Sequence, residues 1–242
     1  MLLLALDTCG PNGSLAVLND VDVLTTLCRP NNSEPEDYSS WLLPAVRQVL
    51  QTAGVTMLEL DAYAAAVGPG SFTGVRVGLT TVKAWSEVYG RSIAAVSRLE
   101  AIAVQAAGAE PYIAASADAR RSQIFGALYR RAPALERVGD EMVIAPEKFL
   151  DWAAETAGAD RIHWISTEPP CLTETEAWSV RRSKGETVSA ASGLLAPVIG
   201  RLGYRLALQH QFTDALAVDA NYVRRSDAEI FWKGGSVRVS TR

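Results

Sequence analysis

The sequence has 242 residues, 48% of them hydrophobic and 21% charged, which is the composition of a globular chain able to bury a large core. A net charge of −4 excludes the global basic field that attracts nucleic acid. Cys9, Cys28 and Cys171 are too widely spaced for a disulfide framework or a zinc ribbon, and the apolar run at 2–6 is too short for a signal peptide or a membrane span. We therefore expect a cytoplasmic protein with no membrane association.

The first part of the chain predicts three strands followed by alternating helices and strands. The strands are separated by turn sequences rich in glycine, asparagine and aspartate. In chain order we expect strands at 1–7, 14–18 and 21–28, a helix at 37–53, a strand at 61–67, a helix at 72–89, a strand at 92–96 and a helix at 98–107. A turn sequence at 108–111 then marks the best boundary, which assigns 1–107 to a first lobe.

The second part repeats this pattern. We expect strands at 112–117, 123–130 and 137–144, a helix at 146–157, a strand at 161–166 and a long helix at 189–209. Ser189 or Ser192 would cap the last helix with Pro197 just inside it, while 167–184 resists assignment. The repetition predicts two related α/β lobes, the second comprising 108–242 with a C-terminal tail.

The helix expected at 37–53 is more apolar than one packing surface requires. At 100° per residue its apolar side chains cover an arc of roughly 200°, about twice the stripe that packs on one sheet. The part of the arc that does not pack on the sheet could be covered by the helix at 72–89 or by another protein chain. The sequence leaves both open.

The stretch 68–90 is the most informative part of the chain. A strand, a loop containing Gly68, Gly70 and Ser71, and a helix together present backbone N–H groups that could bind an anion. The loop fits neither a Walker A motif, because Arg76 stands where a lysine would be needed, nor a dinucleotide fingerprint. Its glycines can equally serve a turn and close packing. Small and aromatic residues continue one helical face at Gly74, Gly78, Thr81 and Trp85.

The first turn offers a second candidate site. Asp7 and Thr8 follow a buried strand, where they could hold a hydrated Mg²⁺ and a nucleotide phosphate or simply cap the turn. We expect no metal site of the chain's own, because His163 and His210 are far apart and no His-x-x-x-His pair exists. Cys9 has no histidine nearby in a motif, and no Gly-x-Ser-x-Gly sequence is present, so a peptidase is disfavoured.

Four segments together resemble the TsaB family, also called YeaZ. They are Asp7-Thr8 after the apolar strand, the glycine block 68–79, the block 118–129 beginning Asp-Ala-Arg-Arg, and Tyr-Val-Arg-Arg at 222–225. The resemblance implies an α/β, two-lobed actin-like fold (ASKHA, ribonuclease H-like), with each lobe a mixed sheet flanked by helices. The chain departs from the family pattern at 32–41, where Asn-Ser-Glu and an insertion-like segment precede Trp41-Leu-Leu-Pro.

The resemblance also implies a function. Members of the family are non-catalytic scaffold or activator subunits that bind TsaD, together with TsaE, for threonylcarbamoyl transfer to adenosine 37 of ANN-decoding tRNAs. They form homodimers when TsaD is absent, they contact tRNA only indirectly, and they need no cofactor beyond weak nucleotide binding. On this interpretation the chain is not itself an enzyme.

Two sets of candidate residues follow. The expected partner interface consists of Trp41, Leu42, Ala45, Val49, Gly74, Arg76, Gly78, Thr81 and Trp85. The alternative function, an ASKHA-type phosphotransferase or ATPase, would use Asp7, Thr8, Gly68, Gly70 and Ser71.

Overall fold

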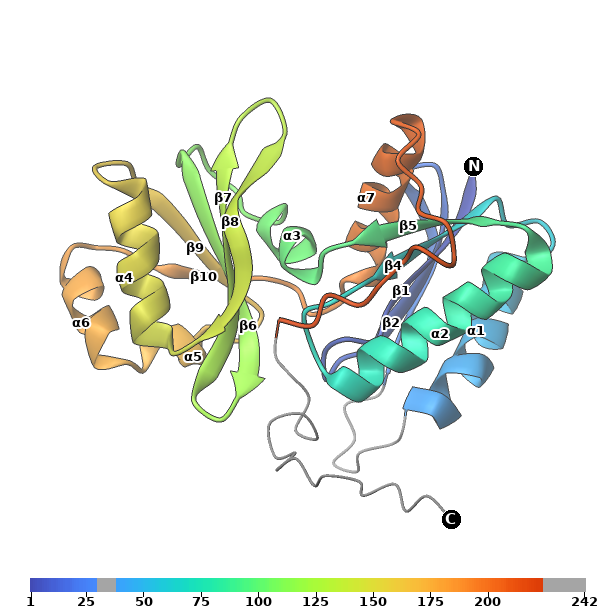
Figure 1. Ribbon diagram of the computed structural model, residues 1–242, viewed down its shortest axis with the longest axis horizontal. Helices are drawn as coiled ribbons and strands as arrows, with labels where there is room; N and C mark the ends of the chain where they lie inside the picture. Colours follow the sequence, from blue (N-terminus) through green and yellow to red (C-terminus); the bar gives the residue numbers. More distant parts are fainter. Residues whose placement is uncertain (30–37, 224–242) are drawn as a thin grey trace, which may run out of the picture.

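A computed structural model of the chain describes residues 1–29 and 38–223, which form two lobes, each built around a five-stranded sheet (Figure 1). The first lobe's sequence contributes β1 (Leu2–Asp7), β2 (Ser14–Asn19), β3 (Asp22–Cys28), α1 (Tyr38–Ala53), β4 (Ala62–Ala66), α2 (Phe72–Tyr89), β5 (Ser92–Val96) and α3 (Arg98–Ala103). The second contributes β6 (Tyr112–Arg120), β7 (Gln123–Arg131), β8 (Leu135–Ile144), α4 (Pro146–Ala157), β9 (Ile162–Ser166), α5 (Pro170–Thr173), α6 (Glu176–Ser183), β10 (Val188–Ala190) and α7 (Ala196–Leu208).

The two sheets have the same topology. The first has the order β3-β2-β1-β4-β5 and the second the order β8-β7-β6-β9-β10, so each reads third, second, first, fourth and fifth strand. In both sheets the first three strands pair antiparallel and the last two pair parallel. This duplicated mixed sheet confirms the predicted two-lobed, actin-like fold class.

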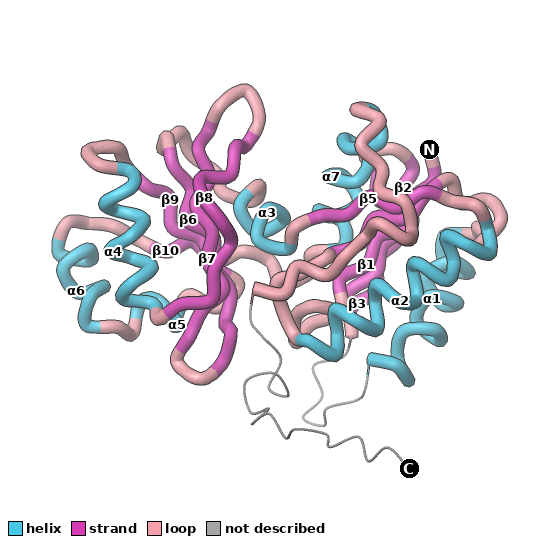
Figure 2. The backbone as a smooth tube through the Cα atoms, in the orientation of Figure 1, coloured by secondary structure: helices cyan, strands magenta, loops and turns pink. Residues whose placement is uncertain are grey.

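Helices cover both faces of the first sheet (Figure 2). Consecutive residues of a strand point to opposite faces, and Tyr63 of β4 packs against Trp85 of α2 while Ala64 lies against Gly203 of α7. The side with α2 also carries α1, which contacts β2 and β3. The first sheet is therefore buried between the α1–α2 pair and α7.

The last helix of each repeat packs on the sheet of the other lobe. α3 follows the first sheet in sequence but contacts β6, β7 and β9, and α7 follows the second sheet but contacts β1, β2, β4 and β5. An ion pair of 2.8 Å between Glu100 of α3 and Arg205 of α7 joins the two exchanged helices. The outer face of the second sheet is covered by α4, whose Phe149 is fully buried.

This exchange corrects the predicted domain division. All of 108–242 was assigned to the second lobe and all of 1–107 to the first, whereas α7 packs on the first sheet and α3 on the second. Sequence spacing gives the repeat but not which sheet a terminal helix packs on, because both sheets offer an apolar face.

Most predicted elements are found within a few residues of their expected ends, and the differences have local causes. The long helix expected at 189–209 is wrong at its start: Ser189 lies in β10, and the helix begins at Ala196 with Pro197 in its first turn. The helix expected at 98–107 ends at Ala103. The unassigned stretch contains α5 and α6, whose four and eight residues are too short for a clear period.

The segment 213–223, which we call the strap, runs from α7 across the first sheet to the region between the lobes (Figure 1). Thr213 bonds to Ile93 at the edge of β5, and the Asn221 amide donates to the Val67 carbonyl at 2.8 Å. The Asn221 side chain also donates to the buried carboxyl of Glu141, which accepts from Ser97 as well. The strap thereby connects β4, α3 and the second sheet.

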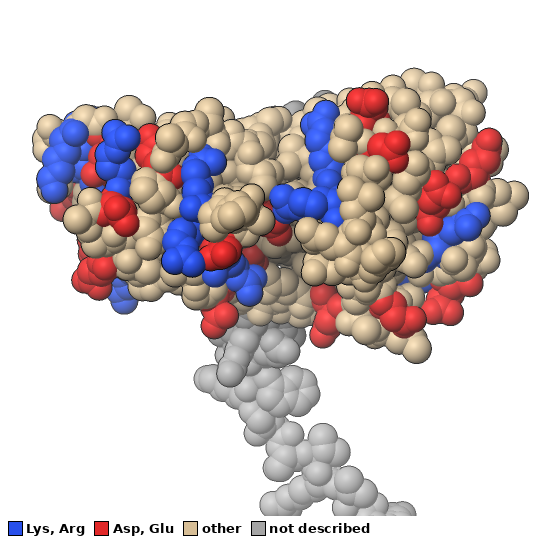
Figure 3. Space-filling model, turned by 90° about the horizontal axis from the view of Figure 1, so that it is seen from above, with Lys and Arg blue, Asp and Glu red and all other residues tan. Residues whose placement is uncertain are grey.

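The surface fits the modest net charge. On the face shown in Figure 3, basic and acidic side chains are interspersed over both lobes. Within the described residues, every helix is too short or too polar to cross a lipid bilayer. All three cysteines are unpaired thiols.

Candidate functional site

The structure brings together the turn after β1 and the loop before α2, which contain the candidate phosphate-site residues Asp7, Thr8, Gly68, Gly70 and Ser71. These two segments bond directly to each other: the Ser71 amide donates to the Cys9 carbonyl at 2.7 Å, and the Thr8 hydroxyl donates to the Gly74 carbonyl at 2.7 Å. A Cβ atom at position 70 would overlap the Cys9 carbonyl, so the two backbones are in contact. The junction is therefore filled by the chain's own atoms.

The start of α2 has its own cap. The Ser71 hydroxyl accepts from the Gly74 amide at 3.3 Å, and this satisfies one of the free N–H groups that an anion would otherwise bind. The Gly68 carbonyl accepts from the Arg98 amide at 2.8 Å, which ties the loop to the start of α3.

Asp7 is paired with an arginine from a distant element. Its Oδ2 lies 3.5 Å from Nε of Arg98, and the two side chains are 0% and 5% exposed. Asp7 Oδ1 also accepts from the Cys9 amide at 2.8 Å. A buried carboxylate requires a compensating charge, and Arg98 supplies the positive charge that a Mg²⁺ ion would bring to this position.

The guanidinium of Arg98 also occupies the space beside the turn. A Cβ atom at Gly10 would overlap it, and the Gly10 carbonyl accepts a hydrogen bond from the Tyr38 hydroxyl. The turn itself contains no arginine or lysine, and Arg98 reaches it from 91 residues away in sequence. One sequence feature could have indicated this role for Arg98: it is a charged residue at the start of a helix that directly follows a buried strand.

Cys9 and Tyr38, which lie close to Asp7, both have raised pKa values. Burial, with the neighbouring Asp7 charge adding to it, raises the pKa of the Cys9 thiol well above its usual value, so the thiolate is disfavoured. Burial likewise raises the pKa of Tyr38 to about 12, with the Asp7 charge acting in the same direction. Among the described residues no group of three histidine, cysteine or acidic side chains is arranged to hold a metal ion.

The two glycines predicted for the partner interface face the inside of the subunit. Gly74 lies against the Thr8 carbonyl and Gly78 against the Thr8 hydroxyl, with Leu6 Cδ1 3.5 Å from an added Cβ at position 78. They allow α2 to approach β1, which corrects their assignment to a docking face. The helical period correctly placed the two glycines on one face of α2. It could not tell whether that face packs on the chain's own sheet or on a partner, because small residues allow close approach in both cases.

The α1 residues predicted for the interface are also largely internal. Leu42, Ala45 and Val49 are 1%, 4% and 1% exposed, because they pack in the core cluster that contains β2. Trp41 is half-buried, with its ring 6.0 Å from that of Tyr38. The wide apolar arc of α1 thus covers the chain's own core first.

A groove remains on the outer side of the α1–α2 pair. It has a volume of about 400 Å³ and is lined by Leu43, Val46, Arg47, Leu50, Gln51, Val55, Met57 and Trp85. Leu43 at its rim is 58% exposed, and Leu58 and Val88 nearby in the sequence are 71% and 74% exposed. Of the predicted interface residues, Trp85 is the one that lines this groove.

Arg76 and Trp85 lie on opposite flanks of α2, because nine residues at 100° each place them about 180° apart. Arg76 is stacked on the Phe72 ring at 3.8 Å and donates from Nε to the Tyr222 hydroxyl at 3.1 Å. Thr81 is half-buried and hydrogen-bonds the Val77 carbonyl of its own helix at 2.7 Å. The nine predicted interface residues therefore do not form one surface.

Comparison with known proteins finds relatives named for tRNA threonylcarbamoyladenosine or its transferase. The sequence model of the family "TsaD: tRNA N6-adenosine threonylcarbamoyltransferase" matches residues 32–237. The chain is 28% identical to the Bacillus subtilis tRNA threonylcarbamoyladenosine biosynthesis protein TsaB over 96% of this chain and 98% of that protein. It is 32% identical to the Escherichia coli protein of the same name over 54% of this chain and 56% of that one.

A solved structure has the same fold. A Pseudomonas aeruginosa protein described as similar to peptidase YEAZ superposes with a TM-score of 0.72 at 26% identity, over 92% of this chain and 99% of that one. The duplicated sheets define an actin-like fold, and the junction at Asp7 is filled by the chain's own side chains. The chain belongs to the TsaB (YeaZ) family, within the wider sequence family named for TsaD.

Proposed function

We propose that this chain is a non-catalytic subunit in tRNA threonylcarbamoyladenosine biosynthesis, which docks on a TsaD partner through α1 and α2. Family membership supports the pathway, since the relatives are named for it. TsaE would join the assembly, tRNA would be reached through the partner, and two copies of the chain would pair when TsaD is absent. The cytoplasm is the compartment that this role implies.

The observation that carries the proposal is the apolar groove beside Trp85. Its rim residue Leu43 is more than half exposed, although the neighbouring Leu42 and Val46 of the same helix are buried. An exposed apolar surface of this kind on a soluble protein marks an interaction site.

The outer face of α2 continues beside the groove with small, uncharged side chains. Residues spaced by four and three positions form this face, which we call the seam: Thr73, Val77, Thr80, Ala84 and Val88. Four of them are exposed, and Val77 is half-buried. Small uncharged side chains at this spacing let a second helix approach closely, as in a two-helix seam.

The packing around Asp7 supports a non-catalytic role. A phosphotransferase needs room for a metal-bound phosphate, whereas Arg98 and Tyr38 fill the turn and the α2 cap is satisfied internally. Purified chain should therefore show no Mg²⁺-dependent ATP hydrolysis above that of an Asp7→Ala variant. Turnover that disappears in Asp7→Ala would instead favour the phosphotransferase alternative.

A matched pair of valine substitutions tests the docking face. Val88 in the seam and Val180 on α6 of the second lobe are both exposed helical valines, at 74% and 58%. Val88→Asp should weaken TsaD binding in calorimetry by at least about 10-fold, because it buries a carboxylate in an apolar contact. Val180→Asp should bind like wild type. Equal affinities for all three proteins would remove this face from the interface.

A further inference from the structure

Arg76 is an exposed residue in the first turns of α2, yet its side chain is held by two contacts. Its guanidinium carbon lies 3.8 Å from the centre of the Phe72 ring, and its Nε donates to the Tyr222 hydroxyl at 3.1 Å. The rings of Phe72 and Tyr222 are themselves 4.9 Å apart. One face and one edge of the guanidinium are thus held by two aromatic side chains.

The strap anchors this arrangement from the other side. Tyr222 follows Asn221, whose backbone amide is bonded to Val67 and whose side chain is bonded to the buried Glu141. Tyr222 is 41% exposed and is therefore not fixed by burial in the core. Its position is set by the bonded Asn221 before it and by the contact with Arg76. The guanidinium is therefore pre-organised by elements of both lobes.

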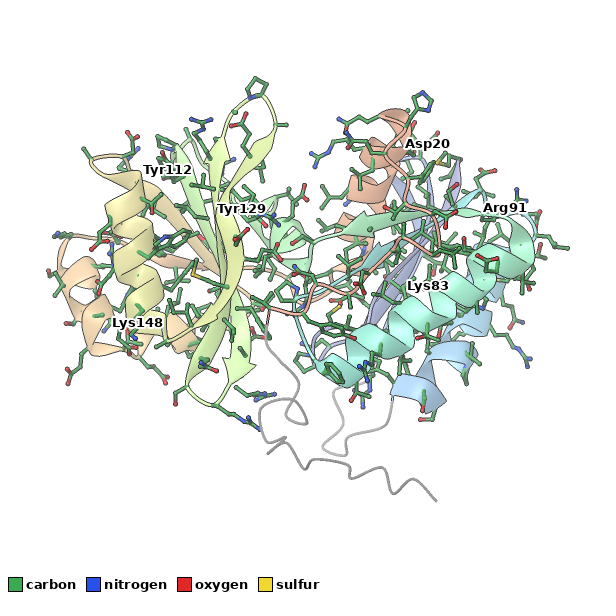
Figure 4. The ribbon with its side chains drawn as sticks, in the orientation of Figure 1. Asp20, Lys83, Arg91, Tyr112, Tyr129 and Lys148 are labelled. Atoms are coloured by element: carbon green, nitrogen blue, oxygen red, sulfur yellow. The ribbon has the colours of Figure 1, made fainter. Side chains whose placement is uncertain are left out.

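The outer edge of the guanidinium remains available. Within the described part of the chain, neither terminal nitrogen of Arg76 has a hydrogen bond or an ion pair, although Nε is used. Two parallel N–H donors in a plane match the two oxygens of a carboxylate. Lys83 lies seven residues further along the same flank of α2 and adds a second positive charge (Figure 4).

We propose that Arg76, held by Phe72 and Tyr222, is a preformed site for a carboxylate of the protein that docks on α2. The strap is then part of the docking surface, because its tyrosine sets the orientation of the guanidinium. This inference rests on the proposed function. It adds a polar anchor on the flank of α2 opposite the apolar groove, so the partner would lie across the seam between them.

A protein carboxylate fits these observations better than an RNA phosphate. RNA binding draws its affinity from many phosphate contacts, and this chain carries a net charge of −4. A single rigid arginine beside exposed aromatic rings is instead the composition of a protein-interface hot spot. Holding the side chain in place before binding reduces the entropy lost on association.

The test measures binding of the full-length chain to purified TsaD by calorimetry at low and high salt. Arg76→Lys keeps the charge but loses the planar fork, and we expect at least about 10-fold weaker binding. Tyr222→Phe removes only the hydroxyl and should weaken binding by about 3-fold or more through loss of orientation. Arg201→Lys is the matched control, since Arg201 also uses only Nε in its hydrogen bond, to Val21, and lies on α7. It should bind within about 2-fold of wild type.

The outcomes separate the inference from the proposed function. Absence of binding by the wild type would refute the proposed function. Wild-type binding that is unchanged in Arg76→Lys and Arg76→Gln would overturn the carboxylate site and leave the groove in place. Arg76→Gln should also flatten the salt dependence of binding. Weaker binding with unchanged salt dependence and a lowered Tm would show that Arg76 only holds the strap, and loss of tRNA binding alone would assign it to RNA.

Discussion

Gly78→Ala tests whether the small residues of α2 serve packing inside the subunit. The added methyl group would lie closer than 3.0 Å to the Thr8 hydroxyl and 3.5 Å from Leu6 Cδ1. Thr8 is 1% exposed and its hydroxyl is already bonded to the Gly74 carbonyl at 2.7 Å, so it cannot turn away without losing that bond.

The expected magnitude follows from three terms. Overpacking a core costs about 1–3 kcal/mol, and leaving the Gly74 carbonyl unsatisfied costs about 1–3 kcal/mol. Replacing glycine by alanine inside a helix contributes about 1 kcal/mol in the opposite direction. We expect a net loss of about 1–5 kcal/mol, and each kcal/mol lowers the Tm by about 2–4 °C in a chain of this length.

The assay is a double-mutant cycle with Thr8→Ala, measured by denaturant unfolding. Thr8→Ala removes the hydroxyl that the new methyl group would meet, so Gly78→Ala should become neutral or slightly stabilising in that background. The coupling energy between the two changes should be about 2–6 kcal/mol, because both the overpacking term and the unsatisfied-carbonyl term are absent in the Thr8→Ala background. Gly74→Ala is the control, because its methyl group would overlap the Thr8 backbone carbonyl, which Thr8→Ala leaves in place.

Additive effects of Gly78→Ala and Thr8→Ala would refute this account of the helix contact. So would a Gly78→Ala variant that unfolds at a higher denaturant concentration than wild type. A variant that stays fully stable but no longer binds TsaD would return Gly78 to the docking face.

Two further predictions concern buried charges. Arg98→Met should lower the free energy of unfolding by about 3–5 kcal/mol in thermal or denaturant unfolding, because it leaves Asp7 buried and unpaired. Adding Asp7→Asn, which keeps an acceptor for the Cys9 amide, should recover part of that loss. No recovery would argue against the pairing. Burial raises the pKa of the Glu141 carboxyl above its usual 4.5, so the native state holds more protons than the unfolded state and stability should fall as pH rises from about 4.5 through the raised pKa. Glu141→Gln should remove this part of the pH dependence, and parallel pH profiles for the two proteins would contradict it.

The duplicated sheets were predictable because hydrophobic periodicity and turn residues are local signals. Each strand of the first sheet is bounded by residues that favour turns, and the helix at 72–89 ends at Gly90, which adopts the left-handed conformation that glycine favours. The exchange of α3 and α7 between lobes carries no such signal, since it depends on which of two similar apolar surfaces a helix meets.

The site shows the same limit. Asp7 and the glycine loop were found because each directly follows a predicted strand and consists of residue types that form turns. Arg98 was missed because a residue that fills a site from a distant element looks in sequence like any charged residue at a helix start. The side of α2 used by Gly74 and Gly78 was also undetermined, because small residues allow close approach equally to a strand or to a partner.

The filled junction and the open groove lie on opposite sides of α2. The Asp7–Arg98 pair supplies a positive charge from within the chain, and it joins the turn after β1 to the start of α3. Gly74 and Gly78 fix α2 from inside, so its outer face is held in place before any partner arrives. A surface held in this way loses less conformational entropy on association, which is what the proposed docking role requires. The inner and outer faces of α2 are therefore coupled. Weakening the contact between Thr8 and α2 should make the seam less rigid, and it should reduce partner affinity by more than the loss of folded protein explains.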